Sequence, residues 1–174
     1  MTALGMLNRR AVVRRGQQLT WMTIGYNSIE AVVALIAGVL AGSVALIGFG
    51  LDSVIELSSS VASLWRLRAD ATSAARQRSE TIALRLIGVA FLLLAVYVSV
   101  DAISALLTRE SPRSSVLGII VAAGSVVVMP LLARAKRRIA AQLASRALTA
   151  DARQTQLCMY LSVILLGGLV LNAV

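Results

Sequence analysis

Five long apolar segments are the feature that most limits how this chain can fold. They cover about residues 19–41, 43–64, 81–107, 115–133 and 155–174. A helix of about 20 apolar residues is long enough to cross the hydrocarbon core of a bilayer. With 58% hydrophobic residues, the composition suits spanning helices better than the amphipathic helices of a soluble core. The sequence therefore predicts an all-α integral membrane protein, a bundle of five visible transmembrane helices in a lipid bilayer.

The 174 residues leave room for a single transmembrane domain over residues 1–174, whose residues 1–18 form a basic N-terminal arm. The link at Ala41 and Gly42 is so short that the first two segments must form an antiparallel hairpin. Five spans that start inside the cell place Val174 outside. Either the fifth helix is the last one, or a sixth follows beyond Val174.

Arginine and lysine residues predict the orientation of the helices, because cytoplasmic loops carry an excess of them. They gather before the first segment, after the second and after the fourth, at Arg9, Arg10, Arg14, Arg15, Arg66, Arg68, Arg76, Arg78, Arg134, Lys136, Arg137, Arg138, Arg146 and Arg153. The opposite side has only Arg109 and Arg113. We therefore expect a cytoplasmic N-terminus and two long cytoplasmic loops in a plasma membrane, specifically a bacterial inner membrane. The loop over residues 134–150 is expected to continue helically along the membrane surface.

Composition and charge exclude several classes of function. The net charge of +9 is spread between the apolar segments and forms no single basic face, so we expect no nucleic-acid partner. The chain has one cysteine and no histidine, which excludes an intrachain disulfide and the commonest metal ligand. No set of nucleophile and base and no cofactor motif is visible, so we expect a protein that is not an enzyme.

Two carboxylates, Asp52 and Glu56, stand four residues apart inside the second apolar segment. A charge at the centre of such a span costs about 2.5 kcal/mol or more. Helical spacing of four places both acids on one face. The simpler alternative is a buried pair hydrogen-bonded to neighbouring helices. Because adjacent acids repel unless a cation or protons intervene, we interpret them first as a cation site.

A second pair with the same spacing, Gln154 and Cys158, opens the last segment. The two pairs, one from each of two helices, are expected to converge into a site with four metal ligands. Alternatives stay open for each residue. Gln154 suits hydrogen bonding between helices, and Cys158 alone suits a small buried hydrophobic position.

Three further acids are candidates for proton relay or accessory roles. Glu30 lies near the middle of the first segment, where it pairs with an interior donor, relays protons or supplies another ligand. Asp101 lies near the outer end of the third segment, on an access path or simply at the interface. Asp151 is expected to cap the fifth helix or to lie at its inner vestibule. The serine run over residues 58–60 is expected to serve close helix packing.

Three stretches carry a resemblance to a known family. Residues 41–56, AGSVALIGFGLDSVIE, resemble the second transmembrane helix of the cation diffusion facilitators, and residues 76–80, RQRSE, are similar to the start of their third helix. Residues 150–158, ADARQTQLC, resemble the start of their fifth. The resemblance implies a six-helix, homodimeric transporter of divalent metals, chiefly zinc, that exchanges metal for protons. It places the metal ligands at the two pairs named above.

This chain departs from the family pattern at three of those four positions. Glu56 stands where the family has a second aspartate, Gln154 where it has histidine and Cys158 where it has aspartate. Two carboxylates and a thiolate suit zinc, and sulfur also admits cadmium or cobalt. Metal binding needs deprotonated ligands, so exchange of metal for protons is the expected coupling. The alternatives are a metal-binding or metal-sensing membrane protein without transport, and a purely structural bundle.

Overall fold

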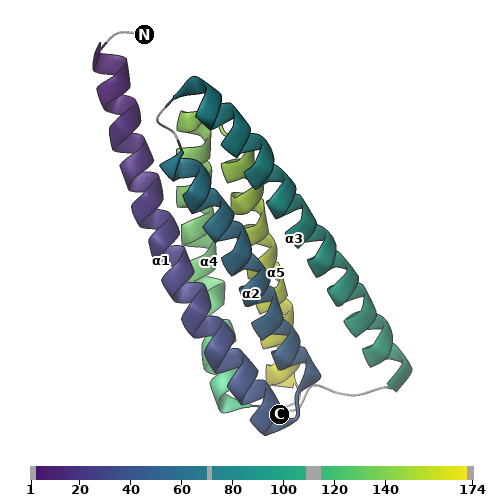
Figure 1. The fold of residues 1–174 in the computed structure, drawn as a ribbon. Coiled ribbons are helices and arrows are strands. Elements are labelled where there is room, and N and C mark those ends of the chain that lie inside the picture. Colours follow the sequence, from purple (N-terminus) through teal and green to yellow (C-terminus); the bar gives the residue numbers. More distant parts are fainter. Residues whose placement is uncertain (1–2, 70–71, 109–114, 172–174) are drawn as a thin grey trace.

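A computed structural model describes residues 3–69, 72–108 and 115–171. The described residues form five helices: α1 (Ala3–Ala41), α2 (Val44–Arg68), α3 (Ser73–Thr108), α4 (Val116–Leu143) and α5 (Arg146–Leu171). Each contains a stretch long and apolar enough to cross a membrane. Figure 1 shows all five running side by side as long rods. The predicted all-α membrane bundle is therefore confirmed.

The turn between α1 and α2 confirms the predicted hairpin. Gly42 has a φ of 60°, in the left-handed region that glycine adopts without strain. Ser43 then caps α2, and its side chain accepts a hydrogen bond from the Leu46 backbone N–H. Chain reversal thus takes only two residues, Gly42 and Ser43, and α1 packs along α2.

The helices extend well beyond the apolar segments at one end of the bundle. This end holds the start of α1 and the α2–α3 and α4–α5 turns, and we call it the basic end; it lies at the top of Figure 1. The expected helical continuation over residues 134–150 is confirmed, because α4 continues to Leu143 and α5 begins at Arg146, which leaves only Ala144 and Ser145 between the two helices. A single left-handed residue, Ala144, ends α4. The basic residues of this region therefore lie on helices that continue the bundle.

Two residues that the orientation argument placed in loops are instead buried inside helices. Arg66 lies within α2 and Lys136 within α4, with 1% and 5% of their surfaces exposed. Both pair with acids from other helices, which compensates for burying their charge. Arg109 and Arg113, expected on the opposite side, lie outside the described residues.

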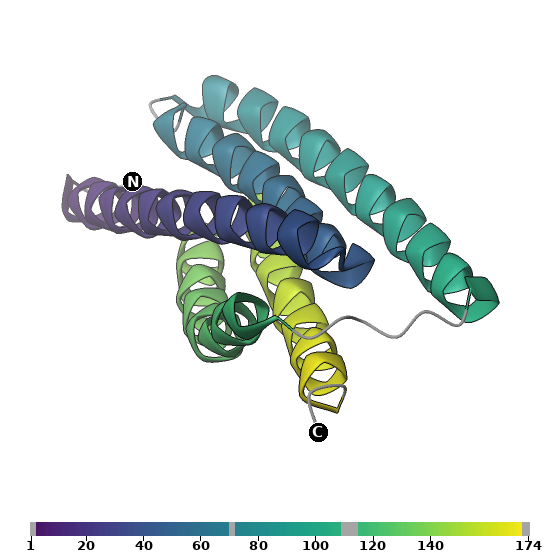
Figure 2. The same cartoon turned by 90° about the horizontal axis from the view of Figure 1, so that it is seen from below.

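Four helices form the centre of the bundle, and α3 leans away from it. α1 packs on α2 and α4, while α5 packs on α4 and α2. α3 packs against α2 and α5, and both views show it diverging from the others toward the end opposite the basic end (Figures 1 and 2). Leu92, Leu93 and Val96 of α3 are well exposed, as expected for a helix face that meets lipid. The candidate site residues lie on α2 and α5, whose contact is covered by neighbouring helices.

Candidate metal site

The two predicted ligand pairs meet where α2 and α5 pack in antiparallel directions. Asp52, Glu56, Gln154 and Cys158 all have at most 1% of their surface exposed. Cys158 lies beside Asp52, close enough for their charges to interact. At the other end of the site, Ser59 Oγ donates to Gln154 Oε1 at 2.6 Å. The tertiary structure thus brings both pairs to one interface inside the bundle.

The pairs are offset, so Glu56 faces a residue that the sequence analysis did not single out. Thr155 Oγ1 donates to Glu56 Oε1 at 2.5 Å. Gln154 lies nearer the basic end, level with Ser59. Two of the serines that were expected to serve packing, Ser59 and Ser60, therefore also hydrogen-bond across the α2–α5 interface. The one sequence signal for Thr155 was its place four residues after Asp151, on the same helix face.

Several polar atoms of this cluster lack hydrogen-bond partners of ordinary geometry among the described residues. They are both carboxylate oxygens of Asp52, Oε2 of Glu56 and Nε2 of Gln154. Leaving buried polar atoms unpaired costs about 1–3 kcal/mol each, and more for charged groups. The same described residues contain no group of three histidine, cysteine, aspartate or glutamate side chains already arranged to hold a metal ion. A cation at this site must therefore draw the side chains closer together.

Lys136 of α4 reaches into the bundle next to the same cluster. Its Nζ lies 3.1 Å from Asp151 Oδ1 and 3.7 Å from Glu56 Oε1. It also donates to Thr155 Oγ1 at 2.8 Å and to Ser60 Oγ at 3.3 Å. The sequence analysis missed this role because Lys136 stands among arginines. A signal was present, since buried positions of α4 recur at Met129, Ala133, Lys136, Ala140 and Leu143, at helical spacing.

Asp151 does not take the first of the two places predicted for it, the cap of the fifth helix. It lies in the second turn of α5, buried and paired with Lys136, and does not cap the helix. The cap is made by Ser145, whose side chain accepts from the Leu148 N–H, and by Glu80 of α3, which accepts from the Ala147 N–H at 2.7 Å. An acid one turn inside the helix is stabilised here by the buried lysine.

Glu30 forms a second buried cluster between α1, α2 and α4. Its Oε2 accepts from Ser53 at 2.9 Å and its Oε1 accepts from Ser125, which also bonds to Tyr26 at 3.0 Å. Ser53 is the neighbour of Asp52 in the chain, so this cluster adjoins the candidate site without sharing a hydrogen bond with it. Asp101 belongs to α3, but its side chain lies outside the described part of the structure.

Comparison with known proteins identifies the family of the chain. The family model described as the cation efflux transmembrane domain matches residues 20–174. This chain belongs to that family. It is also similar to transmembrane protein 163 of Xenopus laevis, with 32% identity over 133 residues, which are 76% of this chain and 47% of that protein. The chain therefore spans about half the length of this curated relative.

In this cation efflux domain, a cavity reaches the candidate site at Asp52. Asp52 lines a cavity of about 130 Å³ between α2, α3 and α5, together with Tyr97. A Cβ atom on Gly48 would lie 2.3 Å from the Tyr97 hydroxyl oxygen, so glycine is what lets this tyrosine approach α2. Toward the basic end, Lys136 and Asp151 line a cavity of about 10 Å³. That is about the smallest space that holds one water molecule.

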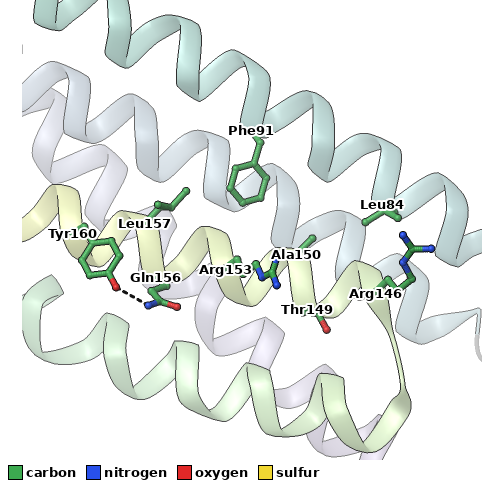
Figure 3. A pocket seen from close by; sticks show the side chains of 9 residues that line it. All are labelled: Leu84, Phe91, Arg146, Thr149, Ala150, Arg153, Gln156, Leu157 and Tyr160. Atoms are coloured by element: carbon green, nitrogen blue, oxygen red, sulfur yellow. Dashed lines mark hydrogen bonds between the residues drawn. The ribbon is translucent and has the colours of Figure 1, made fainter.

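A larger cavity of about 710 Å³ lies between α3 and α5 (Figure 3). Its walls include Phe91 and Leu157, with Arg146 and Arg153 toward the basic end. None of the four candidate ligands lines it. The four candidate ligands therefore lie away from this larger cavity, in the buried α2–α5 cluster.

Proposed function

We propose that this protein is a transporter of divalent metal cations, zinc first and cadmium or cobalt second. The metal is held by Asp52, Glu56, Gln154 and Cys158 and is exchanged for protons by alternating access. Membership of the cation efflux family supports the cation. The observation that carries the site is the set of three buried carboxylate oxygens at the α2–α5 interface that lack a hydrogen-bond partner of ordinary geometry among the described residues.

Each ligand has an atom suited to the metal. Both oxygens of Asp52 and Oε2 of Glu56 are unpartnered among the described atoms, and the Cys158 sulfur lies beside Asp52. Gln154 presents its amide nitrogen in this structure, while its oxygen is bound by Ser59. Rotating the Gln154 amide by 180° would turn its oxygen toward the site and let its nitrogen donate to Ser59 Oγ. The Ser59 hydroxyl would then donate to the Ile55 carbonyl, which lies 3.4 Å away.

Protons are the expected counter-ion because carboxyl groups and a thiol bind a metal ion only after they have lost their own protons. Glu30 is proposed as the accessory acid of this exchange, since it is buried one helix away and held by hydroxyl donors from α2 and α4. Asp151 and Asp101 are proposed as accessory groups on the two sides of the membrane. The cavity that reaches Asp52 suggests a conformation open away from the basic end and closed toward it.

The proposed setting follows the charge pattern and the family. Residues 1–174 act as one transmembrane domain with the N-terminus and the basic end in the cytoplasm, as the gathering of arginines at that end supports. We place it in a plasma membrane, specifically a bacterial inner membrane. The family resemblance supports a homodimer. A metal-binding or metal-sensing protein without transport is the second candidate, because Gln154 and Cys158 replace the usual ligands.

Reconstitution into liposomes tests the proposal. Zinc binding by calorimetry and zinc flux with an imposed pH gradient are measured for the wild type, Asp52→Asn and Glu56→Gln, with Gln154→Ala compared against its matched neighbour Gln156→Ala. We expect Asp52→Asn to abolish zinc binding and zinc flux. We expect Gln154→Ala to weaken both, and Gln156→Ala to leave both unchanged.

Three other results would each reject a part of the proposal. Binding without flux in the wild type supports the sensor, and no binding at all supports a purely structural bundle. Flux that ignores the pH gradient rejects exchange for protons.

A further inference from the structure

We propose that Lys136 is a built-in cation that competes with the metal for Glu56 and thereby sets how tightly the site holds its cargo. This inference rests on the proposed metal site. Lys136 belongs to α4, whereas all four proposed ligands belong to α2 and α5. Its ammonium nitrogen lies 3.7 Å from Glu56 Oε1 and carries the same sign of charge as the cargo, and the transport scheme above does not use it.

The ammonium group is held in place independently of Glu56. An ammonium has three N–H donors, and three acceptors surround it: Asp151 Oδ1 at 3.1 Å, Thr155 Oγ1 at 2.8 Å and Ser60 Oγ at 3.3 Å. Each donor therefore has a partner other than Glu56. With 4% of its side chain exposed, Lys136 stays in the interior when the charge on Glu56 is taken up by something else.

Glu56 is shared between this cation and the site. Its Oε1 lies 3.7 Å from the ammonium nitrogen and accepts from Thr155, so the lysine acts on it through charge and through the intervening hydroxyl. Its Oε2 lacks a hydrogen-bond partner in the described part of the chain. A metal ion can bind Oε2 without expelling the lysine. The two cations then lie on the same carboxylate, where a low dielectric strengthens their repulsion.

The packing around Lys136 prevents the ammonium from withdrawing into water. On the side facing the basic end, Lys136 and Asp151 line a space of about 10 Å³. On the other side, the cavity of about 130 Å³ reaches Asp52. A cation that enters through that cavity meets Asp52 first and the lysine-bound Glu56 second. Any movement of α4 relative to α2 and α5 changes the Lys136–Glu56 distance, and with it the affinity of the site.

Zinc affinity of the purified chain of residues 1–174 tests this role, because loss of a merely structural residue does not tighten binding. We expect Lys136→Met to lower the zinc Kd at least about tenfold, as removal of a nearby like charge requires. Lys136→Arg keeps the charge and should stay within about threefold of the wild type. Arg137→Met makes the same charge change at an exposed position of α4 and should leave the Kd unchanged.

A second variant protects the test against misfolding, since Lys136→Met leaves Asp151 buried without its partner. Lys136→Met combined with Asp151→Asn removes both charges and should also bind zinc more tightly than the wild type. An unchanged or weaker Kd in a folded variant overturns the competition, and so does failure of both neutral variants to fold, which would make the lysine a structural partner. If the wild type binds zinc and Asp52→Asn does not, the proposed metal site stands. An unchanged or weaker Kd of the Lys136 variants, or their failure to fold, then rejects only the inference about Lys136. If the wild type binds none, the proposed function fails.

Discussion

Replacing Glu80 by alanine is expected to destabilise the basic end of the bundle. Glu80 of α3 joins three helices. Its Oε2 accepts from Arg66 Nε of α2 at 2.6 Å, and its Oε1 accepts from the Ala147 N–H of α5 at 2.7 Å. Ser145 Oγ lies 2.9 Å from both oxygens. One carboxylate therefore balances a buried guanidinium and satisfies the start of α5.

The structure sets the size of this effect. Removing one partner of a buried ion pair costs about 3–5 kcal/mol. The side chain of Arg66 is 2% exposed but that of Glu80 is 21% exposed, so solvent screens part of the pair and we take about 2 kcal/mol. Loss of the acceptor for the Ala147 N–H adds about 1 kcal/mol, as for a helix cap. The sum of about 3 kcal/mol corresponds to a decrease in Tm of about 6–12 °C for a chain of this size.

Thermal unfolding in detergent, followed by circular dichroism or by a fluorescent dye that reports exposed thiols, measures this change. Glu80→Gln keeps the shape and the acceptor oxygen, so it should lose about half as much as Glu80→Ala. Gln77→Ala, at an exposed position one turn earlier on α3, is the matched control and should melt with the wild type. If Glu80→Ala and Gln77→Ala melt together, the three-helix junction does not stabilise the bundle and the reasoning is refuted.

Three more predictions concern the site. Gly48→Leu should slow zinc flux at least about tenfold, because its side chain collides with Tyr97 beside the access cavity; a Tyr97→Ala change in the same chain should restore flux, and failure to do so would place the obstruction elsewhere. Glu30→Ala should lower the free energy of unfolding by about 1–2 kcal/mol, since its two serine donors can fall back on carbonyls of their own helices; thermal melting checks this, and Glu30→Gln should lose less. Cys158→Ser should weaken cadmium binding at least about tenfold more than zinc binding, because sulfur favours the softer ion; an unchanged cadmium-to-zinc ratio in calorimetry would show that the thiol is not a ligand.

The fold and the two candidate pairs were accessible from the sequence because their signals are local. Apolar length predicts each spanning helix, and the short link at Gly42 predicts the hairpin. Spacing of four places Asp52 with Glu56 and Gln154 with Cys158 on shared faces. These inferences need only the geometry of one helix and the cost of a charge in an apolar span, both of which a single segment carries.

The partners of those residues depend on how the helices align with one another. The periodicity of residues within one helix carries no information about that alignment. Only the tertiary structure shows that Thr155 faces Glu56. Lys136 and Arg66 looked like loop charges because the charge pattern reports which side of the membrane a stretch lies on and not which way a side chain points. Their burial is decided by acids on other helices, Asp151 and Glu80, that compensate their charges across the bundle. The sequence alone thus determined the helices and the shared faces of the two candidate pairs, and tertiary packing decided which charges surround them.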